Sequence, residues 1–236
     1  MTKTLAPVRT TRTRLDRRLI VVTALRFIDA EGTQGLTMRK LGQELDVEAM
    51  SLYRYVSGRE DLLEGVVAHL LDGIAAHLDE ELTDSWQGYL QTLAHEVRKI
   101  AVTHPAAFPL VATRHPAAPW LRPPLRSIEL VEHFLATLAR HGFDDERIVQ
   151  TYRGFTGFLL GALLLESVAQ GGDVAPVDEP LDQGGALVPH SDGTRGLVDA
   201  PTTRRLQTLL SEDHSAEEFE IGLETLLDRL EKTVSQ

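Results

Sequence analysis

The sequence predicts an all-α protein in which a small three-helix domain precedes a larger helical domain. Apolar residues recur at spacings of three and four along most of the 236 residues, and no segment shows a compelling strand pattern. Two short helical patterns meet at a tight turn between Leu36 and Asp61. Charge is also divided, because residues 1–59 contain 11 Lys or Arg and 6 Asp or Glu while the whole chain has a formal net charge of −11. A basic first part on an acidic remainder favours that end for contact with phosphate.

We expect three parts along the chain. Residues 1–14 form a basic arm, residues 15–60 a helix-turn-helix domain, and residues 61–236 the larger helical domain. Within the last part, residues 171–203 are rich in Gly, Pro and Asp and predict a long, partly disordered loop. Two interpretations of the arm stay open. It contacts the backbone or minor groove of DNA, as other N-terminal arms do, or it is a disordered solubilising tail.

The expected helices follow from apolar stripes and from residues that favour helix ends. The first spans Leu15 to Glu31, with Gly32 and Gly35 behind it. The others are expected at about 38–45, 48–56, 60–81, from Asp84 onward, 125–141, 144–169 and 216–233. Between His104 and Pro124, six prolines exclude a long helix and leave room for a short turn around residues 108–112.

Several polar residues are placed to cap these helices. Thr37 and Asp144 are expected at N-caps, because their side-chain oxygens can accept a free backbone N–H of the first turn. Three pairs have the spacing of a capping box: Ser57 with Glu60, Asp84 with Gln87, and Ser215 with Glu218. Asp46 interrupts the pattern between the two short helices and favours a turn there.

Two short helices at a tight turn are the form of a helix-turn-helix, whose second helix fits the major groove of DNA. Leu41 and Leu45 make one apolar face, and Leu52 and Val56 make the facing one. The other faces carry aromatic and basic side chains, which suit bases and phosphates. The residues we expect to contact DNA are Thr37, Arg39, Ala49, Met50, Ser51, Tyr53, Arg54, Tyr55 and Arg59, with Lys40 beside them. Taken alone, the pattern equally fits a helical hairpin with a solvated charged face.

The run LTMRKLGQELDVEAMSLYRYVSGREDLL resembles the DNA-binding segment of the TetR family of bacterial transcriptional regulators. The resemblance implies a homodimer that binds a palindromic operator in double-stranded DNA, with repression as the family norm. It also implies that the helix at 60–81, about 30 Å long, links the two domains. The operator sequence stays unpredicted, because Ala49, Met50 and Ser51 lack the bidentate pairings that identify bases.

Two apolar helices, at about 144–169 and 216–233, bear on assembly. They either fill the core or pair with the same helices of a second copy around a twofold axis. Resemblance favours the dimer, since they match the family's four-helix dimer interface. Gly154, Gly157 and Gly161 thin the first of these helices, which suggests either close helix approach or room for something else.

The remainder of the chain resembles, more faintly, the ligand-binding domain of tetracycline repressors. Where those proteins hold a drug–magnesium complex, the matching positions of this chain are Ala75, Leu93, Val97, Leu110, Gly157 and Leu165. Magnesium prefers oxygen ligands, so we expect no metal, no cofactor and a largely hydrophobic small-molecule effector. The expected effector-binding residues are Ala75, Leu93, Val97, Leu110, Thr113, Phe158 and Ala162.

Two other classes were weighed. An all-α metal-dependent enzyme is disfavoured, because Glu129, Glu132 and His133 have the wrong spacing for a bundle carboxylate site and no second copy exists. His69 and His77 lie eight residues apart and are better read as solvated or hydrogen-bonded than as metal ligands. No nucleophile elbow, P-loop or dinucleotide fingerprint occurs, so we expect no enzyme. The other class is an interaction module that does not bind DNA, and it requires that the N-terminal domain be inert toward duplex DNA.

Composition bears on location. Cys is absent, which excludes disulfide and thiolate chemistry and fits a reducing cytoplasm. No apolar run of signal-peptide shape occurs at the N-terminus, and the longest apolar stretch, Phe158 to Leu165, is too short to span a bilayer. We therefore expect a cytoplasmic protein without membrane contact.

Overall fold

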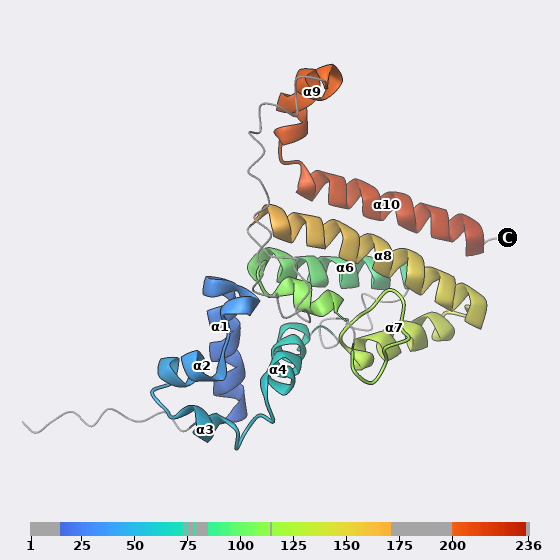
Figure 1. Cartoon of the computed structure of the whole chain (residues 1–236). Helices are drawn as coiled ribbons and strands as arrows, with labels where there is room; N and C mark the ends of the chain where they lie inside the picture. Colours follow the sequence, from blue (N-terminus) through green and yellow to red (C-terminus); the bar gives the residue numbers. More distant parts are fainter. Residues whose placement is uncertain are drawn as a thin grey trace, which may run out of the picture.

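The computed structural model describes residues 15–72, 74, 78, 85–113, 115–170 and 200–234. Within these ranges the chain forms helices and no strand, as the apolar spacing predicts. Figure 1 shows two groups of helices: α1 to α4, the head, lie beside α6, α7, α8 and α10, the body. The helix α9 stands away from both groups (Figure 1).

The head packs three helices and a short fourth around one apolar centre. They are α1 (Arg17–Gly35), α2 (Met38–Glu44), α3 (Ala49–Leu52) and α4 (Arg59–Leu71). Ile20, Leu41, Leu52 and Leu62 have no solvent exposure, so every head helix contributes to this centre. Their burial joins the helix-turn-helix to its two neighbours as one unit.

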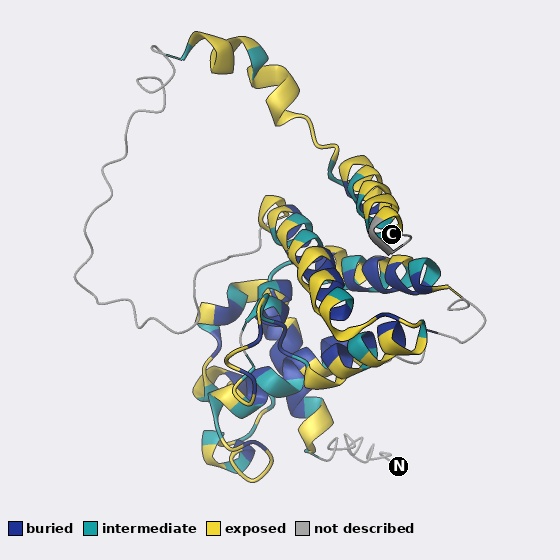
Figure 2. Cartoon of the chain, turned by 90° about the vertical axis from the view of Figure 1, so that its right-hand side faces the viewer, coloured by how far each residue is buried: buried dark blue, intermediate teal, exposed yellow. Residues whose placement is uncertain are grey.

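The body is a stack of longer helices. They are α6 (Trp86–Thr103), the 3₁₀ turn η2 (Phe108–Ala112), α7 (Ile128–Arg140), α8 (Asp145–Ala169), α9 (Pro201–Ser211) and α10 (Ser215–Val234). Buried faces of α6, α7 and α8 meet inside the stack, while α9 has no buried residue (Figure 2). Trp86 and Phe143 meet edge to face with ring centroids 5.4 Å apart, which closes one end of the stack.

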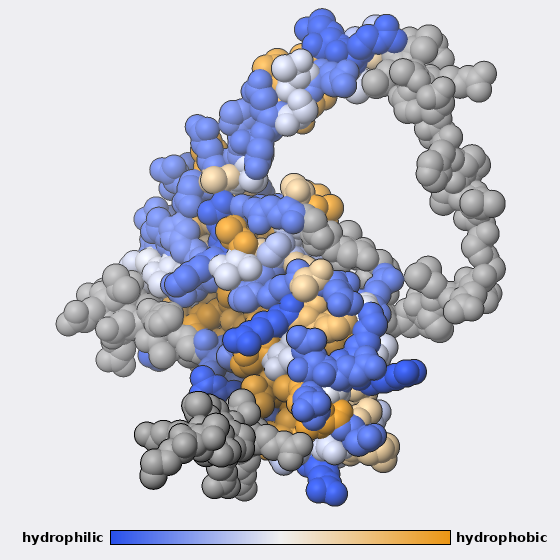
Figure 3. Space-filling view, turned by 90° about the vertical axis from the view of Figure 1, so that its left-hand side faces the viewer, coloured by the Kyte–Doolittle hydropathy of each residue, from blue (hydrophilic) through white to orange (hydrophobic). Residues whose placement is uncertain are grey.

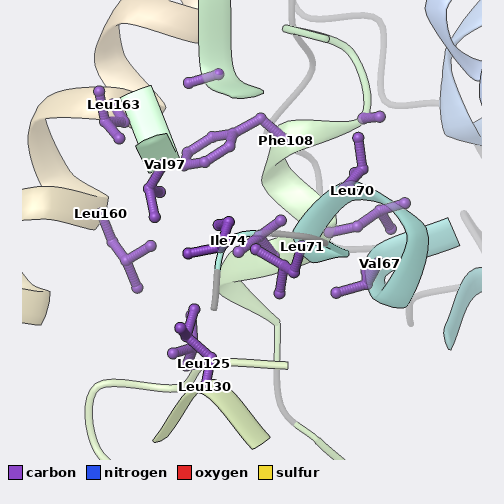
Figure 4. Close-up of a cluster of buried hydrophobic side chains, with 14 of the residues drawn as sticks. Val67, Leu70, Leu71, Ile74, Val97, Phe108, Leu125, Leu130, Leu160 and Leu163 are labelled. Carbon is purple, nitrogen blue, oxygen red and sulfur yellow. The ribbon is translucent and has the colours of Figure 1, made fainter. Parts of the chain in front are cut away.

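Head and body meet through α4. Figure 4 shows side chains of α4 and the residues after it, including Val67, Leu70 and Leu71, gathered near Phe108 of η2. A polar contact adds to this interface, because His104 Nδ1 lies 2.8 Å from Asp29 Oδ2 of α1. The position of the head relative to the body therefore depends on how α4 packs against η2.

Two expected helices are shorter than their patterns predict. The recognition helix ends at Leu52, and Tyr53 to Tyr55 form a turn in which Tyr55 N donates to Leu52 O at 2.9 Å. The helix predicted at 60–81 stops at Leu71, because Asp72 adopts an extended backbone. The helix α4 therefore has 13 residues and is about 20 Å long, shorter than the 30 Å expected, and residues 73, 75–77 and 79–81 lie outside the described residues.

The predicted caps are confirmed at two places and wrong at two others. Thr37 accepts from Lys40 N, and Asp144 accepts from Arg147 N. The Ser57–Glu60 capping box does not form, because Ser57 N donates to the carboxylate of Asp61 instead. The second wrong cap is Ser215, which lies inside α10 and donates to Asp213 through both its backbone N–H and its hydroxyl.

Further differences concern boundaries. The helix expected from residue 125 begins at Ile128, since Ser127 is its N-cap and accepts from Leu130 N. The helix expected from Asp84 begins at Trp86 with Ser85 as the cap, and Asp84 itself lies outside the described residues. The helix α9 was not predicted, and it takes in the end of the expected loop at 171–203, of which residues 171–199 lie outside the described residues.

The helix α8 is long and apolar enough to cross a membrane by length and composition, with a mean hydropathy of 1.3. This contrasts with the expectation drawn from residues 158–165 alone. The share of its apolar window buried inside the protein is 44%. A core helix of a soluble protein passes the same test, so the feature is weak evidence for a membrane segment.

Candidate DNA-binding surface and effector cavity

The turn between α2 and α3 is tight enough to require particular residues. Asp46 adopts a positive φ of 53°, a conformation that Asp tolerates better than most residues. A Cβ added to Gly42 would lie 2.8 Å from Val47 O and 3.2 Å from Ala49 N, both backbone atoms. The backbones of the two helices therefore approach so closely that only glycine fits at position 42.

This turn presents α3 and the residues after it to solvent. The exposed fractions of Met50, Tyr53 and Tyr55 are 74%, 46% and 38%. Large apolar side chains that gather on a surface are typical of contact sites. Arg39 on α2 and Arg54 beside the tyrosines are also exposed, whereas Ala49 and Ser51 are half-buried.

An arginine clasp holds the end of this surface in place. Arg17 of α1 donates to the backbone carbonyl of Tyr55 at 2.9 Å and to both carboxylate oxygens of Asp61, at 2.6 and 3.1 Å. The hydrogen bond from Arg17, followed by that from Ser57 N, lowers the pKa of Asp61 to about 2. The clasp joins α1, the α3–α4 link and α4, so it orients the tyrosine-bearing turn.

Two basic residues predicted to face DNA already have partners in the protein. Arg59 Nη2 donates to Thr33 O at 2.9 Å, and Lys40 Nζ lies 3.1 Å from Glu31 Oε2. Thr37 caps α2, a role that aims the first turn of the helix outward. Arg59 is thus a structural brace of the head in this state.

The body encloses a small apolar cavity. It is lined by Leu93, Val97, Val111, Leu125, Leu130, Phe134, Tyr152, Phe155, Thr156, Leu159 and Leu160, which come from α6, η2, the segment before α7, α7 and α8. Its free volume is about 20 Å³, room for about one water molecule. An organic ligand can enter only if the surrounding helices move apart.

Two polar side chains interrupt the apolar lining. The hydroxyl of Tyr152 donates to Pro123 O at 3.0 Å, and Thr156 lies one turn further along α8. Burial raises the pKa of Tyr152 to about 12, so this phenol stays neutral at physiological pH. The described lining therefore offers one engaged hydroxyl, one further hydroxyl and no charged side chain.

Only two of the expected effector residues, Leu93 and Val97, line this cavity. Leu110 is buried nearby, Thr113 donates its hydroxyl to Leu110 O, and Phe158 stacks on Phe219 of α10. Ala162 packs against the core from outside the cavity, and Ala75 lies outside the described residues.

The cavity residues that sequence reasoning missed come mostly from α7 and α8. Tyr152, Phe155 and Leu159 of α8 recur at helical spacing, which signals a buried face but does not separate a cavity wall from solid core. The positions that match the tetracycline–magnesium ligands do not include these three residues.

A second feature of the body is an uncovered face on α8 and α10. Among the described residues, a Cβ added at Gly154 or Gly161 would meet nothing within 4 Å, so none of them approaches these glycines closely. Leu165 of α8 and Ile221 of α10 are 74% and 57% exposed. Close approach occurs instead at Gly222, where a Cβ would lie 2.6 Å from the Phe158 ring.

Figure 3 shows that the face carrying the head mixes hydrophilic and hydrophobic surface, with α9 mostly hydrophilic above it. Among the described residues, no group of three His, Asp or Glu could hold a metal ion. His133, weighed above as a metal ligand, instead places Nδ1 3.0 Å from the hydroxyl of Tyr89.

Comparison with known proteins agrees with this architecture. An HTH-type transcriptional regulator of Saccharopolyspora erythraea is 29% identical over 149 residues, which cover 63% of this chain and 60% of that protein. The HTH-type transcriptional repressor DrrR1 of Streptomyces coeruleorubidus is 28% identical over 228 residues, which cover 94% of this chain and 78% of that protein.

A crystal structure of a possible TetR family transcriptional regulator from Streptomyces coelicolor A3(2) superposes with a TM-score of 0.69 at 28% identity. The superposition covers 92% of this chain and 100% of that one. The family model of the tetracyclin repressor-like C-terminal domain matches residues 79–234, which is more than half of the chain. The chain therefore belongs to the TetR family of transcriptional regulators, which are not enzymes.

Proposed function

We propose that this regulator is a repressor that binds a palindromic operator as a homodimer and releases it when a largely hydrophobic effector enters the body. The observation that carries the proposal is the pairing of an exposed helix-turn-helix surface with a buried cavity lined almost entirely by apolar side chains. The relative DrrR1, described as a repressor, supports the direction of regulation. Such a protein acts on DNA in the cytoplasm.

On the DNA side, α3 enters the major groove. Met50 and Tyr53 are exposed enough to meet base edges or thymine methyl groups, and Arg39 and Arg54 are placed to meet phosphates. Ala49, Ser51 and Tyr55 complete this surface. Thr37 and Arg59 support it from within, through the α2 cap and the bond to Thr33.

On the assembly side, the uncovered face of α8 and α10 pairs with its copy. Leu165 and Ile221 leave apolar surface in water unless a second copy covers it. Gly154 and Gly161 carry no Cβ, so a helix of the second copy can approach closely there. A twofold pairing of this face gives two recognition helices, as a palindrome requires.

On the effector side, the cavity favours an apolar molecule with at most a few polar groups. Among the described residues, no carboxylate or histidine lines it, so these residues offer no ligand to a drug–magnesium complex. Because the free volume is only about 20 Å³, the effector selects a more open body and shifts the equilibrium by its preference for that state. A saturating tetracycline–magnesium titration should therefore leave DNA affinity unchanged.

The first test is selection of binding sites from a random duplex library with the full-length protein at stated salt. Enrichment of a palindrome is expected. Weak, salt-sensitive binding without enrichment would reject sequence-specific repression.

A pair of variants tests the dimer. Leu165→Arg should lower both the dimer fraction in sedimentation and the affinity for the selected operator. Val102→Arg replaces a residue of α6 that is also exposed, at 42%, and should change neither property. Equal effects of the two variants would contradict the proposed interface.

A further inference from the structure

A buried arginine stands between the effector cavity and the head. Arg126 precedes α7 and is 8% exposed. Its Nη2 donates to Glu60 Oε2 at 3.0 Å, and Glu60 lies in the first turn of α4. Glu64, one turn further along α4, is more distant at 4.0 Å. Burying a guanidinium costs free energy unless it is paired, so this contact calls for an explanation beyond surface charge.

On the body side, Arg126 is joined directly to two walls of the cavity. Its neighbour Leu125 lines the cavity, and its backbone N–H donates to the carbonyl of Val111, which also lines it. Its Nη1 donates to Thr113 Oγ1 at 3.2 Å, and that hydroxyl in turn donates to Leu110 O. Any ligand that pushes Val111 and Leu125 outward must move the backbone of Arg126.

On the head side, Glu60 lies beside the parts that set the DNA-binding surface. Glu60 Oε1 lies 3.9 Å from Arg59 Nη1, and Arg59 is bonded to Thr33 at the end of α1. The next residue, Asp61, receives the arginine clasp. A change in the contacts of Glu60 therefore affects the start of α4, where Arg59 and Asp61 connect α4 to α1.

The surroundings leave room for a change of position. An open cleft of about 920 Å³ separates α1 and α4 from α7, and Arg126 lies in its wall. Arg126 Nε is buried and has no hydrogen-bond partner among the described residues, which leave the guanidinium incompletely satisfied in this arrangement. Incomplete pairing lowers the cost of leaving the arrangement.

We propose that Arg126 is a positioning residue for repression: its pair with Glu60 holds α4 in the DNA-binding orientation, and an effector breaks the pair by displacing Val111 and Leu125. This deepens the proposed function and rests on it. The cavity and the head are then two ends of one bistable contact, which is the physical requirement for coupling between distant sites.

The test compares operator affinity of the full-length protein with that of two variants, without effector. Arg126→Met and Glu60→Gln should each weaken binding to the selected operator about tenfold, because fewer molecules hold the competent orientation. The double variant should bind as weakly as either single variant, since both remove one contact.

The sign of the Glu60→Gln effect separates this role from general electrostatics. Removing a carboxylate near DNA strengthens binding when only charge matters, whereas the proposal requires weaker binding. Glu64→Gln is the matched control on the same helix and should leave affinity unchanged or raise it. The salt dependence of Arg126→Met should keep the wild-type slope, because a phosphate contact would reduce that slope by about one.

The link between the cavity and Arg126 is tested by placing a larger side chain in the cavity wall. Val111→Phe, or Val111→Ile should the larger change prevent folding, should lower operator affinity in the wild-type background and cause no further loss in Arg126→Met. An equal loss in both backgrounds would overturn the link, and unchanged or stronger binding of Glu60→Gln would overturn the role of the pair. Failure of the wild type to bind any selected site would instead reject the proposed function itself.

Discussion

The head and the body are stabilised in different ways. In the head, backbone approaches closely at Gly42, and Arg17 and Arg59 bond to backbone carbonyls of neighbouring elements. In the body, α6, α7 and α8 surround a small cavity whose described lining is apolar except for Tyr152 and Thr156. A closely fitted region held by hydrogen bonds keeps one shape, while a region with spare volume behind an apolar lining can adopt another. We therefore expect the DNA-binding surface to be rigid and the region around the cavity to be adjustable.

The largest expected effect is in the body. Phe155→Ala removes a side chain that is 1% exposed and lines the cavity, and we expect the free energy of unfolding to fall by about 3–5 kcal/mol. Urea unfolding measures this loss. A loss below about 1 kcal/mol would show that the body collapses around the gap and adjusts more readily than we expect.

An intermediate effect is expected in the head. Gly42→Ala forces Val47 O and Ala49 N away from a new Cβ, so the head should lose about 1–3 kcal/mol and sequence-specific DNA binding should fall with it. Operator binding and thermal unfolding together measure the change.

Gly157→Ala is the matched control for that substitution. Among the described residues its added Cβ would meet only Pro123 Cγ, at an ordinary contact distance of 3.9 Å, and alanine favours a helix, so stability should be unchanged or raised by up to about 1 kcal/mol. Equal destabilisation by the two alanines would show that the head is no more closely fitted than the surface of α8.

The smallest expected effect concerns the Arg17–Asp61 clasp. The pKa of Asp61 is lowered from 3.8 to about 2, so its ionised form stabilises the folded head. That stabilisation is fully present above pH 3.8 and is lost as the pH falls through about 2. Because the Arg17 side chain is 46% exposed and solvent screens the pair, we expect about 1 kcal/mol.

Asp61→Asn checks this pH dependence. The variant should lose about 1 kcal/mol near neutral pH and should show a smaller decline in stability than the wild type between pH 4 and pH 2. Denaturant unfolding at each pH provides the measurement. Parallel pH profiles for the two proteins would show that the clasp contributes little to the rigidity of the head.

Local patterns predicted the elements better than their ends. Thr37 and Asp144 cap helices as expected, because an N-cap depends on a hydrogen bond to a residue three positions away. The Ser57–Glu60 box does not form because Asp61, which is hydrogen-bonded to Arg17 of α1, accepts the Ser57 N–H instead. A contact across 44 residues thus outweighed a local preference.

The candidate sites show the same division. Tyr53 and Tyr55 were predicted on the surface, and both are exposed there, because Leu52 and Val56 are buried and leave the residues between them outside. The cavity was harder to predict. Tyr152 and Phe155 line it only because α8 packs across α6 and α7, and no spacing within α8 records that packing.

Periodicity and charge along the chain were enough to predict the helical class, the helix-turn-helix and the separation of a basic head from an acidic body. The place of the cavity and the residues that connect it to α4 follow instead from how the helices pack. Arg126 illustrates the reason. Its partners, Val111, Thr113 and Glu60, come from three separate segments, and their meeting depends on how whole helices pack.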